Sequence, residues 1–287
     1  MYRQLTADPS AERHRRAYSD RPGGYTFRLD DAELSRFRAM AENAQRHEDR
    51  LWSRAGIGAG AAVIDLGCGP GALLPVLARR VGPTGSITAV DADPVACAAA
   101  RHVATELGTS TEVVCADATD TDLAPGRADV IMCRNVLVHN GARAGALLSH
   151  AAALLRDGGH LVSAEPDVDG LDFGAARAER EYDRRWAALM RADGNDPALG
   201  RGDRLADLLR RQGWRVVDQL CWTDALVIDR SPAWAAADAI VGRGFATAAE
   251  LADWQQALER RRAAGPLRCS LTMTAVLAVP PGGSQSR

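Results

Sequence analysis

The stretch Val63-Ile64-Asp65-Leu66-Gly67-Cys68-Gly69-Pro70-Gly71 decides the fold of this chain. It begins as an apolar run, contains one acid and ends in a turn with three glycines, directly before a helical pattern. At the carboxyl end of the first strand of an open α/β sheet, such a turn is where a nucleoside-bearing ligand binds. Glycine permits both the tight turn and a close approach of ligand atoms to the main chain.

Outward from this turn, short apolar runs alternate with helical patterns, which predicts an α/β fold. The runs lack polar alternation, so they indicate parallel strands that are covered on both faces. We therefore expect a Rossmann-like, seven-stranded, mostly parallel sheet with helices on both faces and helical cap insertions. The expected strands are 61–66, 86–90, 111–116, 129–133, 160–164, 214–222 and 268–279.

Capping signals mark several of the helices. Gly158 and Gly159 are expected to end the helix before the fifth strand. Ser231-Pro232 and the capping box Thr247-x-x-Glu250 predict two helix starts in a late insert. The expected helices are 30–55, 72–80, 94–107, 142–156, 175–191 and 202–211, with the insert at 231–264.

The glycine turn fits two ligand-binding templates. Gly67, Gly69 and Ala72 match the dinucleotide fingerprint, whereas Asp65 with Gly67, Gly69 and Gly71 matches an acid followed by three alternate glycines. A carboxylate two residues before the first glycine would repel a pyrophosphate at the helix N-terminus. The acid instead suits a cationic ligand with an ammonium and a sulfonium group.

Acids also end the next two strands. Asp91 follows the second strand, where a carboxylate can accept both ribose hydroxyl protons, and Asp117 follows the third, where it can accept from an adenine amine. A single Asp at such a place is more often a helix cap or a turn residue. Three acids beside a glycine turn point together to a nucleoside site.

These motifs resemble those of class I S-adenosylmethionine-dependent methyltransferases, in particular the UbiE/Coq5-like small-molecule group. The resemblance covers about residues 61–167. It is carried by the glycine turn with its acid, Asp91, Ala116-Asp117-Ala118 and Arg134-Asn135-Val136-Leu137. It implies S-adenosylmethionine as the cofactor and a last strand that runs antiparallel to the others.

The resemblance also implies roles for individual residues. The three glycines would hold the methionine end of the cofactor, Asp65 its ammonium, Asp91 the ribose hydroxyls, and Asp117 with Ala118 the adenine. The expected cofactor-binding set is Asp65, Gly67, Cys68, Gly69, Gly71, Asp91, Ala92, Asp117, Ala118, Arg134 and Asn135.

The acceptor is expected above the end of the fourth strand, so His139 is the candidate catalytic base. The alternative is a loop histidine that caps a helix or packs against the cofactor. Asp167 and Asp169 follow the fifth strand and could hold Mg²⁺ or orient the substrate, but no third ligand accompanies them, so no metal site is predicted. No Asn/Asp-Pro-Pro-Tyr follows the fourth strand, which argues against a nucleic-acid substrate.

The expected organisation is one methyltransferase domain over residues 29–280. A flexible segment (1–28) precedes it and a disordered tail (281–287) follows it. The cofactor-binding core spans about 56–168, and substrate-cap elements span about 29–55, 170–200 and 231–265. Five aromatic residues are candidates for the acceptor pocket, although packing alone explains most of them. They are Tyr182 and Trp186 on one face of the helix at 175–191, Trp234 and Trp254 in the late insert, and Tyr25 of the first segment.

Composition excludes several classes of protein. The 287 residues contain no lysine, so the basic residues are all arginine, which rules out P-loop and Schiff-base enzymes. A net charge of −2 supplies no general attraction to nucleic acid, and no apolar run is long enough for a membrane span. Six scattered cysteines indicate a reducing, cytoplasmic location. A homodimer is compatible with the exposed arginine-rich helices.

Three alternatives to a methyltransferase remain open from the sequence. A relative with the same fold and cofactor can catalyse a non-methylating reaction such as cyclisation. An NAD-dependent oxidoreductase is disfavoured by Asp65 and by the missing Tyr-x-x-x-Lys. A regulatory module that kept the fold is disfavoured by the intact set of acids and glycines.

Overall fold

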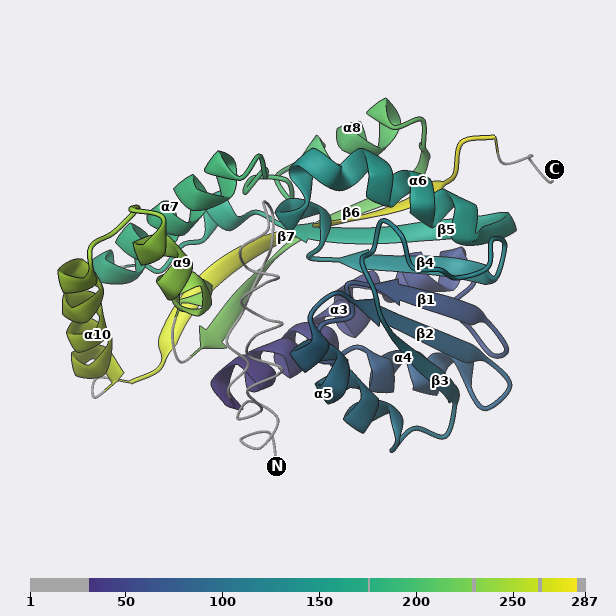
Figure 1. Cartoon of the computed structure of the whole chain (residues 1–287), viewed down its shortest axis with the longest axis horizontal. Coiled ribbons are helices and arrows are strands. Elements are labelled where there is room, and N and C mark those ends of the chain that lie inside the picture. The colour runs from purple at the N-terminus through teal and green to yellow at the C-terminus, as the bar shows by residue number, and fades with distance from the viewer. Residues whose placement is uncertain (1–30, 175, 229–230, 263–264, 283–287) are drawn as a thin grey trace.

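The computed structural model describes residues 31–174, 176–228, 231–262 and 265–282 (Figure 1). The segment 1–28, Tyr25 and most of the tail 281–287 lie outside the described residues. The strands are β1 Ala62–Leu66, β2 Ser86–Asp91, β3 Ser110–Cys115, β4 Ala128–Arg134, β5 Leu155–Pro166, β6 Arg215–Ile228 and β7 Leu267–Val279. The helices are α3 Asp31–Ala55, α4 Leu74–Val81, α5 Pro94–Ala104, α6 Ala144–Leu154, α7 Arg177–Ala192, α8 Arg204–Arg211, α9 Ala237–Gly242 and α10 Ala248–Arg262. Short 3-10 turns are η1 Leu137–His139, η2 Gly141–Arg143, η3 Val168–Gly170 and η4 Pro232–Ala236.

All seven strands form one sheet in the order β3-β2-β1-β4-β5-β7-β6. The first five strands pair in parallel, and β7 pairs antiparallel with both β5 and β6. The expected fold class is confirmed, including the antiparallel last strand. The strand order reverses between β1 and β4, and in open α/β sheets ligands bind at such a switch point.

Apolar side chains on both faces of the central strands make the core. In β4, Val130 and Met132 pack with residues of α3 and α4, whereas Ile131 and Cys133 pack with residues of α6 and α8. Figure 1 shows α3, α4 and α5 on one side of the sheet and α6 and α8 on the other. This two-sided burial explains why the strands read as unbroken apolar runs.

The helical cap, formed by α7, η4, α9 and α10, gathers around the projecting ends of β6 and β7 (Figure 1). Its predicted starts are confirmed. The Ser231 hydroxyl accepts from the Ala233 amide at 3.1 Å, and the Glu250 carboxylate accepts from the Thr247 amide at 2.7 Å. Among the described residues, no helix has the length and apolar character needed to cross a membrane.

The expected ends of two elements were wrong. Gly158 and Gly159 do not end α6, because α6 stops at Leu154 and β5 begins at the next residue. The register shifts there: Ala128 pairs with Leu155, and Val130 pairs with His160, so the glycines lie in an irregular stretch of β5. Strand β6 runs to Ile228, because it pairs with β7 along its whole length.

Candidate functional site

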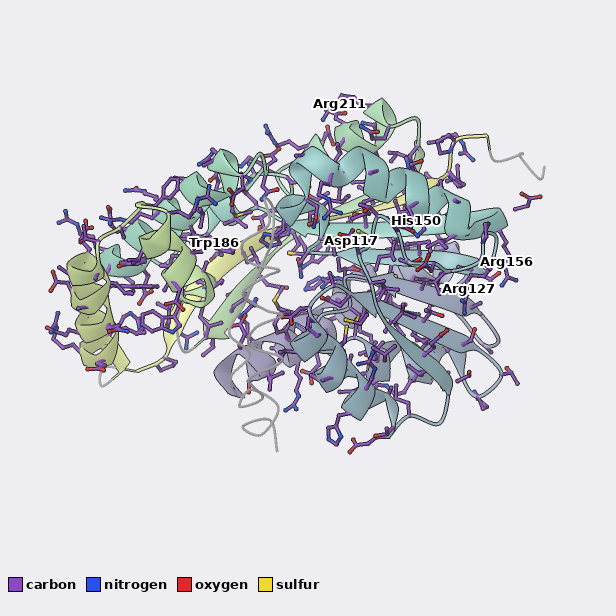
Figure 2. The ribbon with its side chains drawn as sticks, viewed as in Figure 1. Asp117, Arg127, His150, Arg156, Trp186 and Arg211 are labelled. Atoms are coloured by element: carbon purple, nitrogen blue, oxygen red, sulfur yellow. The ribbon has the colours of Figure 1, made fainter. Side chains whose placement is uncertain are left out.

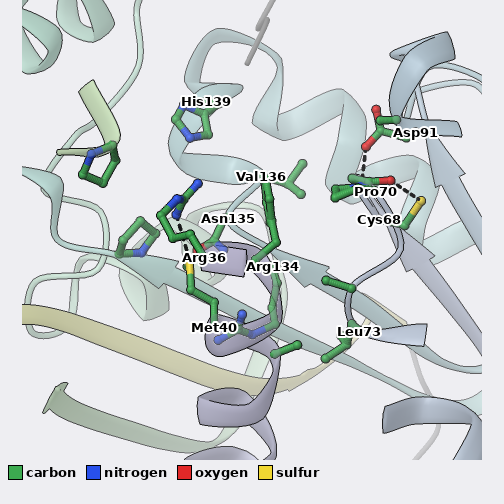
Figure 3. Close-up of a pocket in the computed structure, with 18 of the residues that line it drawn as sticks. Arg36, Met40, Cys68, Pro70, Leu73, Asp91, Arg134, Asn135, Val136 and His139 are labelled. Carbon is green, nitrogen blue, oxygen red and sulfur yellow. Dashed lines mark hydrogen bonds between the residues drawn. The ribbon is translucent and has the colours of Figure 1, made fainter. Parts of the chain in front are cut away.

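A cavity lies at the carboxyl ends of β1, β2 and β4 and continues toward β6, β7 and the helical cap (Figure 3). The residues predicted to bind a cofactor or react gather here: of the twelve, only Gly71 is absent from its walls. Those that line it are Asp65, Gly67, Cys68, Gly69, Asp91, Ala92, Asp117, Ala118, Arg134, Asn135 and His139. The sequence pattern therefore located the cavity.

The cavity has two chemically different ends. The acidic end is lined by Asp65, Asp91, Asp93 and Asp117 from the ends of β1, β2 and β3. The apolar end lies toward the strands β7 and β6 and the helical cap. It is lined by Val168, Leu171, Trp186, Leu226, Ile228 and Leu271. Figure 2 labels one residue of each end, Asp117 after β3 and Trp186 on α7.

Close packing explains the glycines of the turn. Gly67 has φ +78°, and a Cβ there would overlap the Val136 side chain in the loop after β4. Gly69 has φ +54° and lines the cavity. Gly71 has φ +79°, but its missing side chain makes room for Ala100 of α5, since a Cβ would lie 2.9 Å from the Ala100 Cα. The structure thus places Gly71 in packing, away from the cavity.

The buried Asp65 and the half-buried Asp91 form an acidic pair beneath the glycine turn. Asp91 accepts hydrogen bonds from the backbone amides of Gly69 at 2.8 Å and Asp93 at 2.9 Å, so its carboxylate holds the turn. Burial raises the pKa of Asp91 to about 6, against these hydrogen bonds. Burial also raises the pKa of Asp65 to about 7, although Arg134 opposes the shift. A cationic ligand would favour the charged form of both groups.

Asp117 is bound by a residue that the sequence analysis did not identify. Both of its carboxylate oxygens accept from Arg143 Nη2 at 2.6 Å, and one accepts from the Thr119 amide. Burial would raise the pKa of Asp117, but the hydrogen bonds from Arg143 and Thr119 outweigh it and the pKa is lowered. A nucleobase amine bound at Asp117 would therefore donate to a carboxylate that already accepts from Arg143, which also lines the cavity.

The loop after β4 is held in an unusual conformation. Asn135 has φ +56°, and its side-chain oxygen is buried with no hydrogen-bond partner among the described residues. The buried carboxylate of Glu165 accepts from the amides of Val136, Leu137 and Val138 at 3.0–3.2 Å. Burial raises the pKa of Glu165 to about 8, against these three hydrogen bonds. Sequence reasoning missed Glu165, which orients the turn that carries His139.

His139 is buried in the wall of the cavity, with its ring stacked near Trp186 at a centroid distance of 6.1 Å. Burial lowers the pKa of His139 to about 3, and the nearby Arg36 guanidinium adds to the effect. The imidazole is therefore neutral at pH 7, as a base must be, but it is a weak proton acceptor. His139 lies in the cavity, where the prediction placed it, but its low pKa argues against a role as the catalytic base.

Arg134 lines the cavity but its guanidinium also joins two elements. It donates from Nε and Nη2 to Glu48 of α3 at 3.0 and 2.8 Å, and Glu48 accepts from Trp52 Nε1 at 3.0 Å. Glu48 is fully buried. This ion pair fixes α3, which contributes Arg36, Phe37 and Met40 to the cavity.

The acids after β5 have protein partners. Asp167 accepts from Arg201 Nε at 2.8 Å and Nη2 at 3.0 Å, and Asp169 pairs with Arg191. Within the part of the chain that the structure describes, no three acidic, histidine or cysteine side chains are grouped as metal ligands.

Most of the candidate pocket aromatics pack on one another. Tyr182 stacks on Trp254 with centroids 3.5 Å apart, and Trp234 lies 4.9 Å from the same ring. None of these three lines the cavity, whereas Trp186 does. The three rings form the interior of the helical cap.

Residues 63–159 match the family described as "Methyltransferase domain". Over this segment the chain is similar to methyltransferase domains, and its sheet has the strand order of the class I methyltransferase fold. The match covers the glycine turn, Asp91, Asp117, Arg134, Asn135 and His139, and ends in the early part of β5.

Relatives of this methyltransferase domain match only part of the chain. An "Uncharacterized 37.1 kDa protein in transposon TN4556" from Streptomyces fradiae is 37% identical over 127 residues, which is 44% of this chain and 36% of that protein. A ribosomal protein L11 methyltransferase from Pelotomaculum thermopropionicum is 33% identical over 138 residues, 45% of this chain and 43% of that protein. The chain thus spans less than half the length of these curated relatives.

Solved structures share the fold over more of the chain. A putative methyltransferase from Bacillus halodurans has a TM-score of 0.54 and 15% identity, covering 81% of this chain and 98% of its own. The cyclase SpnF has a TM-score of 0.50 and 20% identity, covering 83% of this chain and 82% of its own. The likeness to both concerns the methyltransferase fold alone.

Proposed function

We propose that this chain transfers a methyl group from S-adenosylmethionine to an O, N or C atom of a small organic acceptor. We place it in cytoplasmic specialised metabolism, in the UbiE/Coq5-like group. The observation that carries the proposal is the pair of acids beneath the glycine turn, the buried Asp65 and the half-buried Asp91, which both line the cavity.

The residues at the acidic end fit this cofactor. A cation would stabilise the charged forms of the buried Asp65 and the half-buried Asp91. Asn135 adds a buried side-chain oxygen without a hydrogen-bond partner among the described residues. Gly69 leaves main chain open to a ligand. When bound, the cofactor supplies an electrophilic methyl group on a sulfonium sulfur. The chain's own residues then hold the acceptor in line with that group, and positioning supplies most of the rate.

A small acceptor fits the apolar end. This end is covered by the helical cap, α3 and the ends of β6 and β7, and Trp186, Leu226 and Leu271 present apolar side chains to it. Such walls suit a compact molecule with an apolar body. His139 would contact the acceptor, because it lies on the loop after β4, lines the cavity and stacks near Trp186.

Calorimetric titration with S-adenosylmethionine, S-adenosylhomocysteine, NAD and NADP tests the cofactor. We expect the two sulfur compounds to bind and the nicotinamide compounds not to bind. Asp91→Asn should weaken binding by at least about tenfold, because a charge-assisted hydrogen bond is lost. Glu106→Gln, an exposed acid beyond α5, is the matched control and should leave binding unchanged.

Product analysis separates methyl transfer from cyclisation in the same fold. Transfer releases one S-adenosylhomocysteine for each acceptor consumed, whereas a non-methylating reaction consumes substrate without releasing it. Preferential binding of NAD, or Asp91→Asn that binds as the parent does, would refute the proposal.

A further inference from the structure

The charges of the cavity are unequally distributed between its two ends. Every acid that lines it among the described residues belongs to the acidic end, where the proposed cofactor is held. At the apolar end, the titratable groups that line the cavity in the described chain are Arg36, His139 and Cys269. The end proposed for the acceptor therefore presents one permanent cation and no carboxylate from these residues.

Arg36 projects into the cavity from α3, and its guanidinium lies on the side facing His139 (Figure 3). Three contacts along its own helix hold it there: Nε donates to Glu33 at 3.1 Å, Nη2 forms an ion pair with the same carboxylate, and Nη1 lies 2.9 Å from the Met40 sulfur. The Glu33 carboxylate is buried and is not among the residues that line the cavity. Arginine stays protonated even in such a half-buried place.

No group described at this end is suited to remove a proton from an acceptor. Burial, with Arg36, lowers the pKa of His139 to about 3, so its imidazolium is unstable there. Burial raises the pKa of the Cys269 thiol to about 12, with Asp183 adding to the rise and Arg36 opposing it, so a thiolate does not form near neutral pH. An acceptor that has to lose a proton in the cavity therefore finds no effective base among these residues.

We propose that the acceptor is an acidic hydroxyl compound, a phenol, enol or carboxylic acid, bound as its oxyanion beside Arg36. Arg36 is then the residue that selects the acceptor by charge. The inference rests on the proposed function and adds the substrate class. An oxyanion already carries the electron pair that forms the new C–O bond, and the sulfur keeps the pair of the broken C–S bond, so no proton is released.

The same arrangement disfavours other acceptors. An ammonium would be repelled by Arg36 and would have to lose a proton before it could react. A neutral alcohol would gain little from the guanidinium and would leave its proton with no group to accept it.

The test uses a chromophoric acidic phenol, 4-nitrophenol, bound to the complex with S-adenosylhomocysteine, in which no transfer can occur. At a pH below the phenol's own pKa in buffer, we expect binding to raise the phenolate absorbance. The expected decrease in the phenol's pKa is about one unit, which corresponds to about tenfold tighter binding of phenolate than of phenol. Neutral 4-nitrotoluene and cationic 4-nitrobenzylamine should compete weakly.

Three variants at two positions of one helix make the test specific. Arg36→Gln should abolish the gain in phenolate absorbance, and Arg36→Lys should keep part of it because the charge remains. Arg38→Gln, two residues away and exposed, should behave as the parent. Unchanged binding of S-adenosylhomocysteine to Arg36→Gln would establish that the variant is folded.

The outcomes separate the two proposals. A parent protein that fails to bind S-adenosylhomocysteine contradicts the proposed function. A parent that binds it but leaves the phenol's pKa unchanged or raised, prefers the neutral or cationic probe, or binds none of the three, overturns the oxyanion inference alone.

Discussion

At the scale of single residues, the electrostatics of Asp65 connect stability to ligand binding. Its carboxyl group is buried at the end of β1, and burial raises its pKa from the ordinary 3.8 to about 7. Between these two pH values the folded protein keeps a proton that the unfolded chain has lost. The free energy of unfolding therefore falls as the pH rises through this range.

Asp65→Asn should remove the part of this pH dependence that comes from Asp65 and leave the parts that come from Asp91 and Glu165. We expect the stability of the variant relative to the parent to increase from about pH 4 to pH 7 and to level off above pH 7. The final difference should be a few kcal/mol, because the pKa is raised by about three units and each unit corresponds to about 1.4 kcal/mol. Urea unfolding at several pH values measures it. The exposed Asp157→Asn is the control and should follow the parent, and a parallel pH dependence of parent and Asp65→Asn would contradict the argument.

At the scale of elements, a buried ion pair joins α3 to the end of β4, beside the apolar packing of the two elements. Glu48 and Arg134 are far apart in the chain but form hydrogen bonds at 2.8 and 3.0 Å. Removing one partner of a buried pair leaves the other charge without compensation. The consequence should reach the cavity, because α3 also carries Arg36 and Met40.

Glu48→Ala should lower the free energy of unfolding by about 3 kcal/mol, since it strands the Arg134 guanidinium and removes the acceptor of Trp52. Asp49→Ala removes the neighbouring acid, which pairs with Arg80 and is 61% exposed, and should change stability by less than about 1 kcal/mol. Denaturant midpoints of both variants decide the matter. Equal losses would mean that the buried pair contributes no more than a surface one.

The same elements indicate what the sequence could and could not predict. Strand positions were predictable because both faces of the sheet are covered, and the acids at strand ends led to the cavity because parallel strands end at one edge. Glu48, Arg143 and Glu165 were not predictable as site residues, because their roles depend on partners brought near only by folding. Gly158 and Gly159 misled the helix assignment because a glycine pair signals an irregular strand as well as a helix end.

At the scale of the whole molecule, one sheet joins the two ends of the cavity. β5 pairs in parallel with β4, whose loop carries Asn135 and His139, and antiparallel with β7, which extends toward the helical cap. The acidic end and the apolar end therefore share hydrogen-bonded strands and the core on both faces. We expect the described chain to unfold as one cooperative unit, with the cap included.

Binding of the cofactor product should stabilise that whole unit. At a concentration of S-adenosylhomocysteine 100-fold above its Kd, linkage predicts about 2.7 kcal/mol of added stability. For a chain of this size, the corresponding rise in Tm is about 5 °C in a single transition. Scanning calorimetry measures both the shift and the number of transitions. NAD is a control that should show little shift, and Asp91→Asn, with about tenfold weaker binding, should show about half the parent's shift at the same ligand concentration. Two transitions, only one of which moves with the ligand, would mean that β6, β7 and the cap fold separately from the cofactor-binding strands.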